Sequence, residues 1–301
     1  MGGGLLVAYL LDLVVGDPRR LHPVACFGGL AARLARALYA PSRARGALLA
    51  AVLVGGAAAV AELLARRTSR PAALAATTWV ALGGRSLRHE ARHLAELIDG
   101  GQLAEARAGL RSLCGRDATR LNGAELCRAV VESVAENTSD AVVAPLMWGA
   151  LGGAPAVAAH RAANTLDAMF GHRSERYLRF GWAPARLDDL MNWPAARLSA
   201  LLVALVAPLA GGSAAGALSS ARRYGGQHPS PNAGRIEAAF AGALGLRLGG
   251  PLSYAGHLEH RPHLGDGRQP HSGDIERASR LSLLVGAAAA GLSALVAGGR
   301  R

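Results

Sequence analysis

Apolar residues fall into long runs separated by polar stretches. Three runs reach the roughly 20 residues that a helix needs to cross a bilayer, at residues 46–65, 198–218 and 281–299. Three others are shorter or interrupted by glycine and proline, at residues 2–15, 72–84 and 141–159. This pattern favours a multi-pass integral membrane protein. The alternative is an alanine-rich soluble bundle, whose core helices have a similar composition.

The polar segment at residues 85–114 shows a different pattern. Its apolar residues recur with the 3.6-residue period of a helix on both sides of Gly100 and Gly101. This predicts a soluble αα-hairpin with a charged, solvated face. No useful length of alternating strand pattern is present, so we predict an all-α fold with cytoplasmic helical and loop segments. We treat residues 1–301 as a single membrane-embedded catalytic domain.

A row of acidic residues precedes one of the apolar stretches. Glu132, Glu136 and Asp140 recur every four residues and would stack on one face of a helix. No basic residue lies between Arg128 and Arg161 to relieve their repulsion. We therefore predict a site for a divalent cation such as Mg²⁺ or for a cationic partner. Asn137, within the row, extends this first cluster.

Three further clusters of polar residues lie near the ends of apolar segments. The second cluster, in residues 160–177, contains Asn164, Asp167 and Arg176. The third, in residues 179–197, contains Arg186, Asp188, Asp189, Asn192 and Arg197. The fourth, in residues 228–245, contains His228, Ser230, Asn232 and Arg235. Carboxylates near membrane depth are costly and tend to mark function, although each cluster alone is compatible with a purely structural network.

The fourth cluster predicts an anion site. Two prolines precede Asn232, which we expect to be the N-cap of a helix that begins near Gly234. Free backbone N–H groups and the helix dipole converge at such a start and favour a phosphate. The structural alternative is a simple cap within a turn.

Composition narrows the chemistry. The net charge is +12, but all 33 basic residues are arginine, which points to coding bias and weakens any inference of binding to nucleic acid or to an anionic membrane. The absence of lysine excludes a Walker lysine, a Schiff base and a lysine nucleophile. The cysteines, Cys26, Cys114 and Cys127, have no metal-binding or redox spacing and suit a reducing compartment.

A histidine-rich stretch lies late in the chain. His257, His260 and His263 have a spacing that could bind Zn²⁺. Because Pro262 interrupts any helix there and the surroundings are rich in glycine and proline, we predict a surface loop.

Several of these stretches resemble one family. The segments LLVAYLLDLVVGDPRRLHPV, ESVAENTSDAVVAPL and HPSPNAGRIEAAFAGALG are similar to those of the adenosylcobinamide-phosphate synthases of cobalamin biosynthesis, the CobD/CbiB type. The resemblance runs in order from about residue 5 to residue 280. It implies a multi-pass enzyme of the bacterial inner membrane whose active site faces the cytoplasm.

The resemblance also implies a reaction. An aminopropanol, free or as its O-phosphate, would be joined to the free propionate of adenosylcobyric acid in an amide bond, at the expense of ATP and with Mg²⁺. The expected partners are the corrinoid, the aminopropanol and membrane lipid. Other enzymes of late cobalamin assembly are further candidate partners, and no nucleic-acid partner is expected.

The resemblance assigns roles to the clusters. Glu132, Glu136, Asp140 and Asp167 would hold metal, or one of them would deprotonate the amine. Arg186, Arg197 and Arg235 would bind phosphates or corrinoid side-chain groups, with the other residues of the second to fourth clusters. Asp17 and His22, after the first apolar run, are additions to the same site.

Two other functions fit the clusters. One is a Mg²⁺-dependent transferase acting on a lipid or prenyl phosphate, which would consume no ATP. The other is a transporter, for which intramembrane acids and helices broken at Pro145 and Pro208 are expected. A transporter of this kind usually carries an internal repeat, and we see none.

Overall fold

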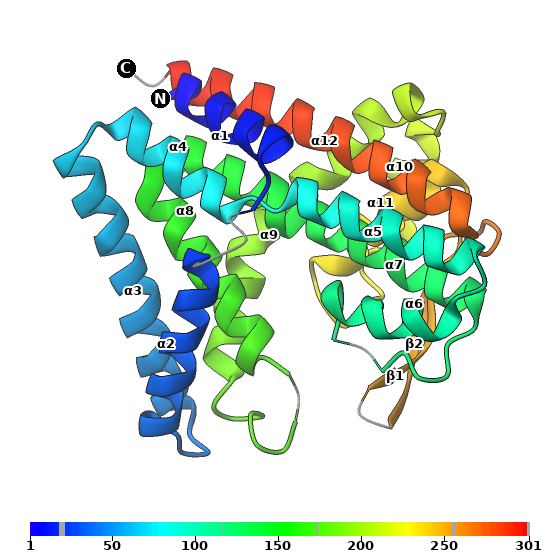
Figure 1. Cartoon of the computed structure of the whole chain (residues 1–301), viewed down its shortest axis with the longest axis horizontal. Helices are drawn as coiled ribbons and strands as arrows, with labels where there is room; N and C mark the ends of the chain where they lie inside the picture. Colours follow the sequence, from blue (N-terminus) through cyan, green and yellow to red (C-terminus); the bar gives the residue numbers. More distant parts are fainter. Residues whose placement is uncertain (18–21, 116, 173, 255–256, 300–301) are drawn as a thin grey trace. The chain divides into compact units, whose positions relative to one another are not determined.

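The computed structural model describes residues 1–17, 22–115, 117–172, 174–254 and 257–299 (Figure 1). Its helices are α1 (Gly2–Val14), α2 (Pro23–Leu38), α3 (Arg43–Arg67), α4 (Arg70–Ala81), α5 (Gly84–Asp99), α6 (Leu103–Gly109), α7 (Gly123–Thr138), α8 (Ala144–Phe170), α9 (Trp182–Val206), α10 (Ala214–Arg223), α11 (Ala233–Leu244) and α12 (Ser272–Gly299). Shorter segments are the 3₁₀ turns η1 (Leu110–Ser112) and η3 (Ala207–Ala210), and the π-helical turn η2 (Ser139–Val143). Two strands, β1 (Leu248–Tyr254) and β2 (His257–Leu264), complete the fold. The prediction of an all-α membrane fold is confirmed, because the described residues are mostly helical and include helices long and apolar enough to cross a membrane.

The chain forms two compact units, each assembled from separate segments. Unit 1 comprises Met1–Gly83, Asp140–Pro194 and Ala289–Arg301. Unit 2 comprises Gly84–Ser139 and Ala195–Ala288. That the whole chain acts as one catalytic domain stays a prediction.

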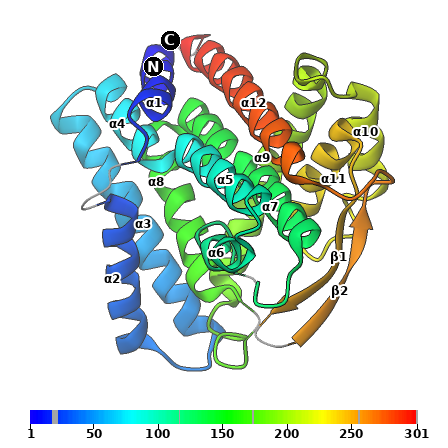
Figure 2. The same ribbon diagram turned by 45° about the vertical axis from the view of Figure 1, so that its right-hand side comes forward.

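Unit 1 is built around α8, which packs against α2, α3 and α4 (Figure 2). Leu49 and Leu53 of α3 meet Leu166 and Phe170 of α8 in a buried core, which Phe180 closes from the following loop. Gly153 interrupts α8 with a φ of 68°, a value that favours glycine, and Pro155 follows. The predicted interruption of the apolar run 141–159 is therefore confirmed.

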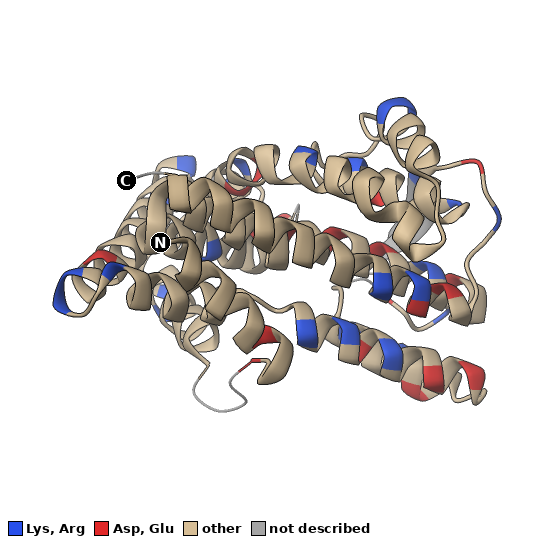
Figure 3. Ribbon diagram, turned by 90° about the horizontal axis from the view of Figure 1, so that it is seen from above, with Lys and Arg blue, Asp and Glu red and all other residues tan. Residues whose placement is uncertain are grey.

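Unit 2 contains the predicted αα-hairpin, formed by α5 and α6. Arginines lie mainly in the first half of α5 and acidic residues mainly in the second (Figure 3), and its apolar face packs against α7. A capping box starts α7, because Asn122 and Glu125 exchange side-chain and backbone hydrogen bonds. Helix α11 packs against α7 and α10.

The hairpin of β1 and β2 corrects our prediction of a surface loop around the three histidines. The two strands are antiparallel, with Leu248 opposite Leu264 and an irregularity between Gly249 and Pro251. His257, His260 and His263 lie on β2 and not in a loop. Glycine, proline and histidine interrupt the alternation of apolar residues, so the strand pattern is weak in the sequence.

Among the described residues, four helical stretches are long and apolar enough to cross a membrane. They are α3, the continuous stretch Gly123–Phe170, the stretch Trp182–Ala210 and α12. The charges of α12 gather in its first turns, and the rest of the helix is apolar (Figure 3). The predicted run 198–218 needs correction: its helix begins at Trp182, ends around Pro208 and Gly211, and α10 starts anew at Ala214. The third polar cluster therefore lies within α9 and not before it.

Candidate functional site

In unit 1, Asn164 of α8 joins two carboxylates from different elements. Its Nδ2 donates to Asp188 Oδ1 of α9 at 3.2 Å and to Asp140 Oδ2 of η2 at 3.3 Å. Asn192, one helical turn after Asp188, donates from its Nδ2 to the same Asp188 oxygen at 2.9 Å. The amides of Asn164 and Asn192 thus both bind Asp188, and the amide of Asn164 also binds Asp140.

His160 extends this arrangement into the interior. It is fully buried, and its Nε2 lies 2.8 Å from Asn192 Oδ1. Because an amide oxygen can only accept, His160 Nε2 carries the proton and donates. This bond fixes the orientation of the Asn192 amide and directs its N–H groups at Asp188. We call Asp140, His160, Asn164, Asp188 and Asn192 the acid–amide network.

Arg161 brings positive charge beside the network. Its Nη1 lies 3.4 Å from Asn164 Oδ1, and its guanidinium interacts electrostatically with Asp17 and Asp140. Buried Arg161 Nε and Asp17 Oδ1 have no hydrogen-bond partner among the described residues. Asp17 therefore lies near Arg161, and these two buried polar atoms are available to a ligand or water.

Two more acids act on the network. Asp167 interacts unfavourably with Asp188 and Asp189, so negative charge accumulates at the facing turns of α8 and α9. Arg186 offsets part of it through a hydrogen bond to Asp189 at 3.3 Å. The second and third clusters of the sequence therefore do come together, with the exceptions of Arg176 and Arg197.

The acid–amide network could hold a magnesium ion that takes one or two ligands from the protein and the others from water and phosphate. It does not resemble a site built from protein ligands alone. Among the described residues, no three histidine, cysteine or acidic side chains converge on one metal position. Magnesium in phosphate-transfer sites often takes only one or two protein carboxylates and completes its shell with water and phosphate oxygens. Asp140 and Asp188, held by one amide, supply such a pair.

The first cluster does not form the predicted row of three converging acids. Asp140 lies in the π-helical turn and belongs to unit 1, whereas Glu132 and Glu136 belong to unit 2. Glu136 is exposed, and Asn137 donates to Ser133 O of its own helix. The π-helical turn interrupts the α-helical spacing on which the prediction rested.

Glu132 instead binds the start of β1. Its carboxylate accepts from Gly249 N at 2.7 Å, while Arg128 donates to Gly249 O at 2.6 Å. Arg128 Nε also lies 3.8 Å from the Glu132 carboxylate. Gly249 has a φ of 74°, and a Cβ there would meet Pro262 O. The two α7 side chains thus hold both polar groups of one glycine, an arrangement we call the Gly249 clamp.

The fourth cluster forms a basic region in unit 2. Arg197 of α9 donates to Asn232 Oδ1 at 3.3 Å, and the charges of Arg197 and Arg235 repel each other. Arg235 Nη1 donates to Ala221 O, but its buried Nε has no hydrogen-bond partner among the described residues. Arg261 donates to His228 Nε2 at 3.0 Å. We call Arg197, His228, Asn232, Arg235 and Arg261 the basic cluster.

The predicted cap of α11 needs correction. Asn232 occupies the N-cap position, but its side chain makes no cap hydrogen bond. Ser230 Oγ accepts from Asn232 N at 3.3 Å and from Ala233 N at 3.2 Å instead. The Asn232 side chain is thereby left to orient Arg197, and the helix begins at Ala233, one residue before the predicted position.

Two predicted site residues have structural partners elsewhere in unit 1. His22 caps α2 by accepting from Val24 N at 3.1 Å. Arg176 is exposed and stacks on the rings of Tyr39 and Tyr177, with its guanidinium 5.0 and 5.4 Å from their centres. The contacts of these two side chains give no support for a place in the acid–amide network.

Comparisons with known proteins support the resemblance. The model of the CobD/Cbib protein family matches residues 5–282. The chain belongs to this family. A cobalamin biosynthesis protein CobD of Mycobacterium tuberculosis (strain ATCC 25618 / H37Rv) is 51% identical over 99% of this chain and 96% of its own length. Proteins of the same name from Pelobacter propionicus and Rhizobium meliloti are 47% and 42% identical, each over 87% of this chain and over 84% and 86% of their own lengths. No solved structure matched.

In this CobD/Cbib family member, several residues of the acid–amide network, the Gly249 clamp and the basic cluster were not predicted from the sequence. His160 and Arg161 lie four and three residues before Asn164, so helical spacing could have identified them as neighbours. Arg128, four residues before Glu132, could have been found in the same way. Arg261 reaches His228 only through the β-hairpin, and no spacing in the sequence indicates that contact.

Proposed function

We propose that the chain acts in cobalamin biosynthesis, as the names of its relatives state for those proteins, and that it forms an amide bond there. The acceptor would be the free propionate of adenosylcobyric acid, and the amine would be (R)-1-amino-2-propanol or its O-phosphate. The observation that carries this proposal is the acid–amide network, in which Asp140 and Asp188 are held by the same Asn164 amide. Membership of the CobD/Cbib family supports this choice of substrates.

The reaction explains why such a network is useful. A carboxylate does not react with an amine at neutral pH, because oxide is a poor leaving group. Transfer of a phosphoryl or adenylyl group from ATP to the propionate oxygen supplies a better leaving group and releases ADP or pyrophosphate, respectively. Attack by the amine then releases phosphate or AMP as the amide bond forms. Asp140 and Asp188 would hold Mg²⁺, which neutralises charge on the ATP phosphates.

The other residues have matching tasks in the proposal. The amine arrives as an ammonium ion and must lose a proton before it attacks. Asp167, which adds to the negative charge beside Asp188, is our candidate for the base. In unit 2, the basic cluster would bind phosphate or the polar side chains of the corrinoid, because arginine guanidinium groups form paired hydrogen bonds with oxyanions. We place the protein in the bacterial inner membrane with its site facing the cytoplasm, where ATP is available.

The test is a complete reaction with protein purified in detergent. The assay contains ATP, MgCl₂, adenosylcobyric acid and either form of aminopropanol. Product is identified by mass, and ATP consumption is measured in parallel. We expect ATP consumption that depends on both the corrinoid and the amine, and an amide product with one of the amines.

Other outcomes separate the rivals. No ATP consumption with any combination of these substrates would overturn the proposal. Transfer of a phosphate-linked group to or from a lipid, without ATP, would favour the lipid or prenyl phosphate transferase. Movement of the corrinoid across a vesicle membrane without chemical change would favour the transporter.

A further inference from the structure

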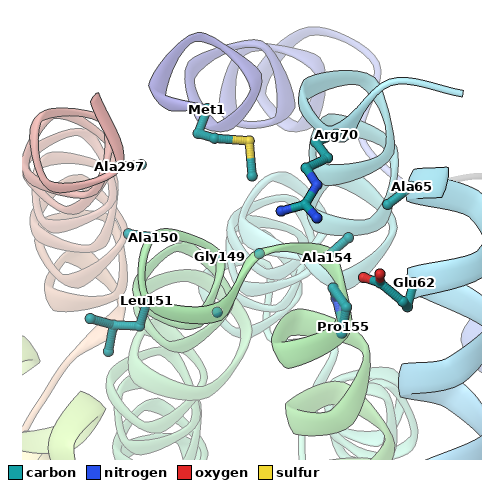
Figure 4. A pocket seen from close by; sticks show the side chains of 12 residues that line it. Met1, Glu62, Ala65, Arg70, Gly149, Ala150, Leu151, Ala154, Pro155 and Ala297 are labelled. Carbon is teal, nitrogen blue, oxygen red and sulfur yellow. The ribbon is translucent and has the colours of Figure 1, made fainter. Parts of the chain in front are cut away.

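Unit 1 contains a hollow of about 270 Å³ at the turn between α3 and α4 (Figure 4). Its wall includes Glu62 near the end of α3, Arg70 at the start of α4, and the interrupted part of α8 around Gly153. Apolar side chains, among them Leu151 and Ala297, line much of the rest. No residue of the acid–amide network contributes to it.

Arg70 lines the hollow, and the chain beside it carries an excess of positive charge. Arg66, Arg67 and Arg70 lie within five residues, against the single carboxylate of Glu62. Glu62 is engaged by Arg66 at 2.8 Å. Neither Arg67 nor Arg70 lies within ion-pair distance of a described carboxylate, although Arg70 and Glu62 attract each other at longer range. The guanidinium of Arg70 points into the hollow (Figure 4), so an anion entering it would meet a positive charge.

The adjoining helix carries an apolar surface to these arginines. Helix α3 is among the stretches able to cross a membrane, and only 22% of its most apolar window is buried within the protein. Val60 and Leu63, in the turns before the arginines, are 69% and 50% exposed. An apolar face that ends in arginines matches a phospholipid, whose acyl chains adjoin a charged headgroup.

We propose that this hollow binds the phosphate headgroup of an anionic phospholipid, with Arg70 as its principal ligand and Arg67 as a second positive charge. The acyl chains would lie along the exposed face of α3. Anionic lipid is favoured over zwitterionic lipid because a choline ammonium would be repelled by the arginines, and basic residues next to a membrane span attract anionic headgroups. This site is separate from the amide-forming reaction.

The test measures lipid binding to the full chain purified in detergent. Dioleoylphosphatidylglycerol, dioleoylphosphatidylcholine and inorganic phosphate are titrated separately, with native mass spectrometry for bound lipid and thermal melting for stabilisation. We expect retention and stabilisation with phosphatidylglycerol alone. Arg70→Ala should weaken this binding about fivefold, the effect of one arginine near an anionic headgroup. Ser69, not Arg70, caps α4, so the helix should survive the substitution.

Arg45→Ala is the matched control, because Arg45 is an exposed arginine in the first turn of α3, at the opposite end of that helix from the hollow. It should leave phosphatidylglycerol binding unchanged. Equal binding of the two lipids, or equal loss in the Arg45 and Arg70 variants, would overturn the proposal. Equal stabilisation by inorganic phosphate would also overturn it, because the site would then recognise a free anion. If Arg70→Ala melts early, Arg70→Lys keeps the charge and should retain most of the binding.

Discussion

At the scale of single residues, the negative charge of Asp188 can be removed without removing the hydrogen bonds that hold its side chain. Both of its amide donors, Asn164 and Asn192, bind the same oxygen, Oδ1. An asparagine at this position could therefore keep both hydrogen bonds and lose only the negative charge. Asp167 and Asp189 repel that charge in the wild type. The carboxylate thus costs stability in the empty protein, which is typical of a group kept for binding or catalysis.

We expect Asp188→Asn to fold at least as stably as the wild type and to lose about 10²–10³-fold in turnover, as when one electrostatic contact to a transition state is removed. Thermal melting and amide formation per folded molecule measure the two effects. Asp266→Asn, at an exposed acid in unit 2, is the control and should change neither. Turnover within about threefold of wild type would remove Asp188 from the site.

We expect His160 to affect the proposed reaction through Asn192, to which it is hydrogen-bonded. With His160→Phe, Asn192 Oδ1 loses its donor, which costs about 1–3 kcal/mol for a buried acceptor. The amide can then turn its oxygen toward Asp188, so kcat should fall while KM for the corrinoid changes little. His160→Gln can donate again and should recover part of kcat. If both variants keep wild-type kcat and only melt earlier, His160 is a core residue without a positioning role.

At the scale of elements, the Gly249 clamp changes the interpretation of Glu132. The clamp gives this carboxylate a structural role, whereas the sequence pattern predicts a metal ligand. We expect Glu132→Ala to lower the free energy of unfolding by about 1–3 kcal/mol, because Gly249 N and Arg128 lose a buried acceptor. Turnover per folded molecule should change little. Unchanged melting with a steep loss of Mg²⁺-dependent turnover would restore the metal assignment.

Elements with strong local patterns were predictable from the sequence. The hairpin of α5 and α6 follows from its amphipathic period and from Gly100 and Gly101. The placement of Asp188 and Asn192 on one face of α9 follows from a spacing of four. The β-hairpin was missed because its alternation is weak. The cap of α11 was assigned to the wrong side chain because asparagine and serine are both good caps, and the contact of Asn232 with Arg197 is not evident from local sequence.

At the scale of the whole molecule, the exposed apolar surface distinguishes a membrane protein from a soluble bundle. Composition alone does not distinguish these two kinds of protein, because the core helices of an alanine-rich soluble bundle resemble membrane-spanning helices. Exposed positions on α3 include Leu48, Val52 and Val60 at 48%, 53% and 69%. In water, a continuous apolar surface of this kind would favour aggregation, whereas in a bilayer it would face lipid. The burial pattern was not accessible from the sequence, since it depends on which faces α2, α4 and α8 cover.

Val52→Arg tests this directly, because Val52 lies well inside α3 and is exposed. A centrally placed arginine costs about 2.5–3.5 kcal/mol on insertion scales, so the variant should integrate poorly into membranes. On the surface of a soluble bundle, the same change should alter stability by no more than about 0.5 kcal/mol. The measurement is the fraction of protein that stays with the membrane after alkaline carbonate extraction, with Val52→Ala as the control that keeps an apolar side chain. We expect Val52→Ala to remain in the membrane fraction and Val52→Arg to be lost from it or degraded. Equal recovery of both variants in a soluble fraction, without detergent, would show that α3 faces water.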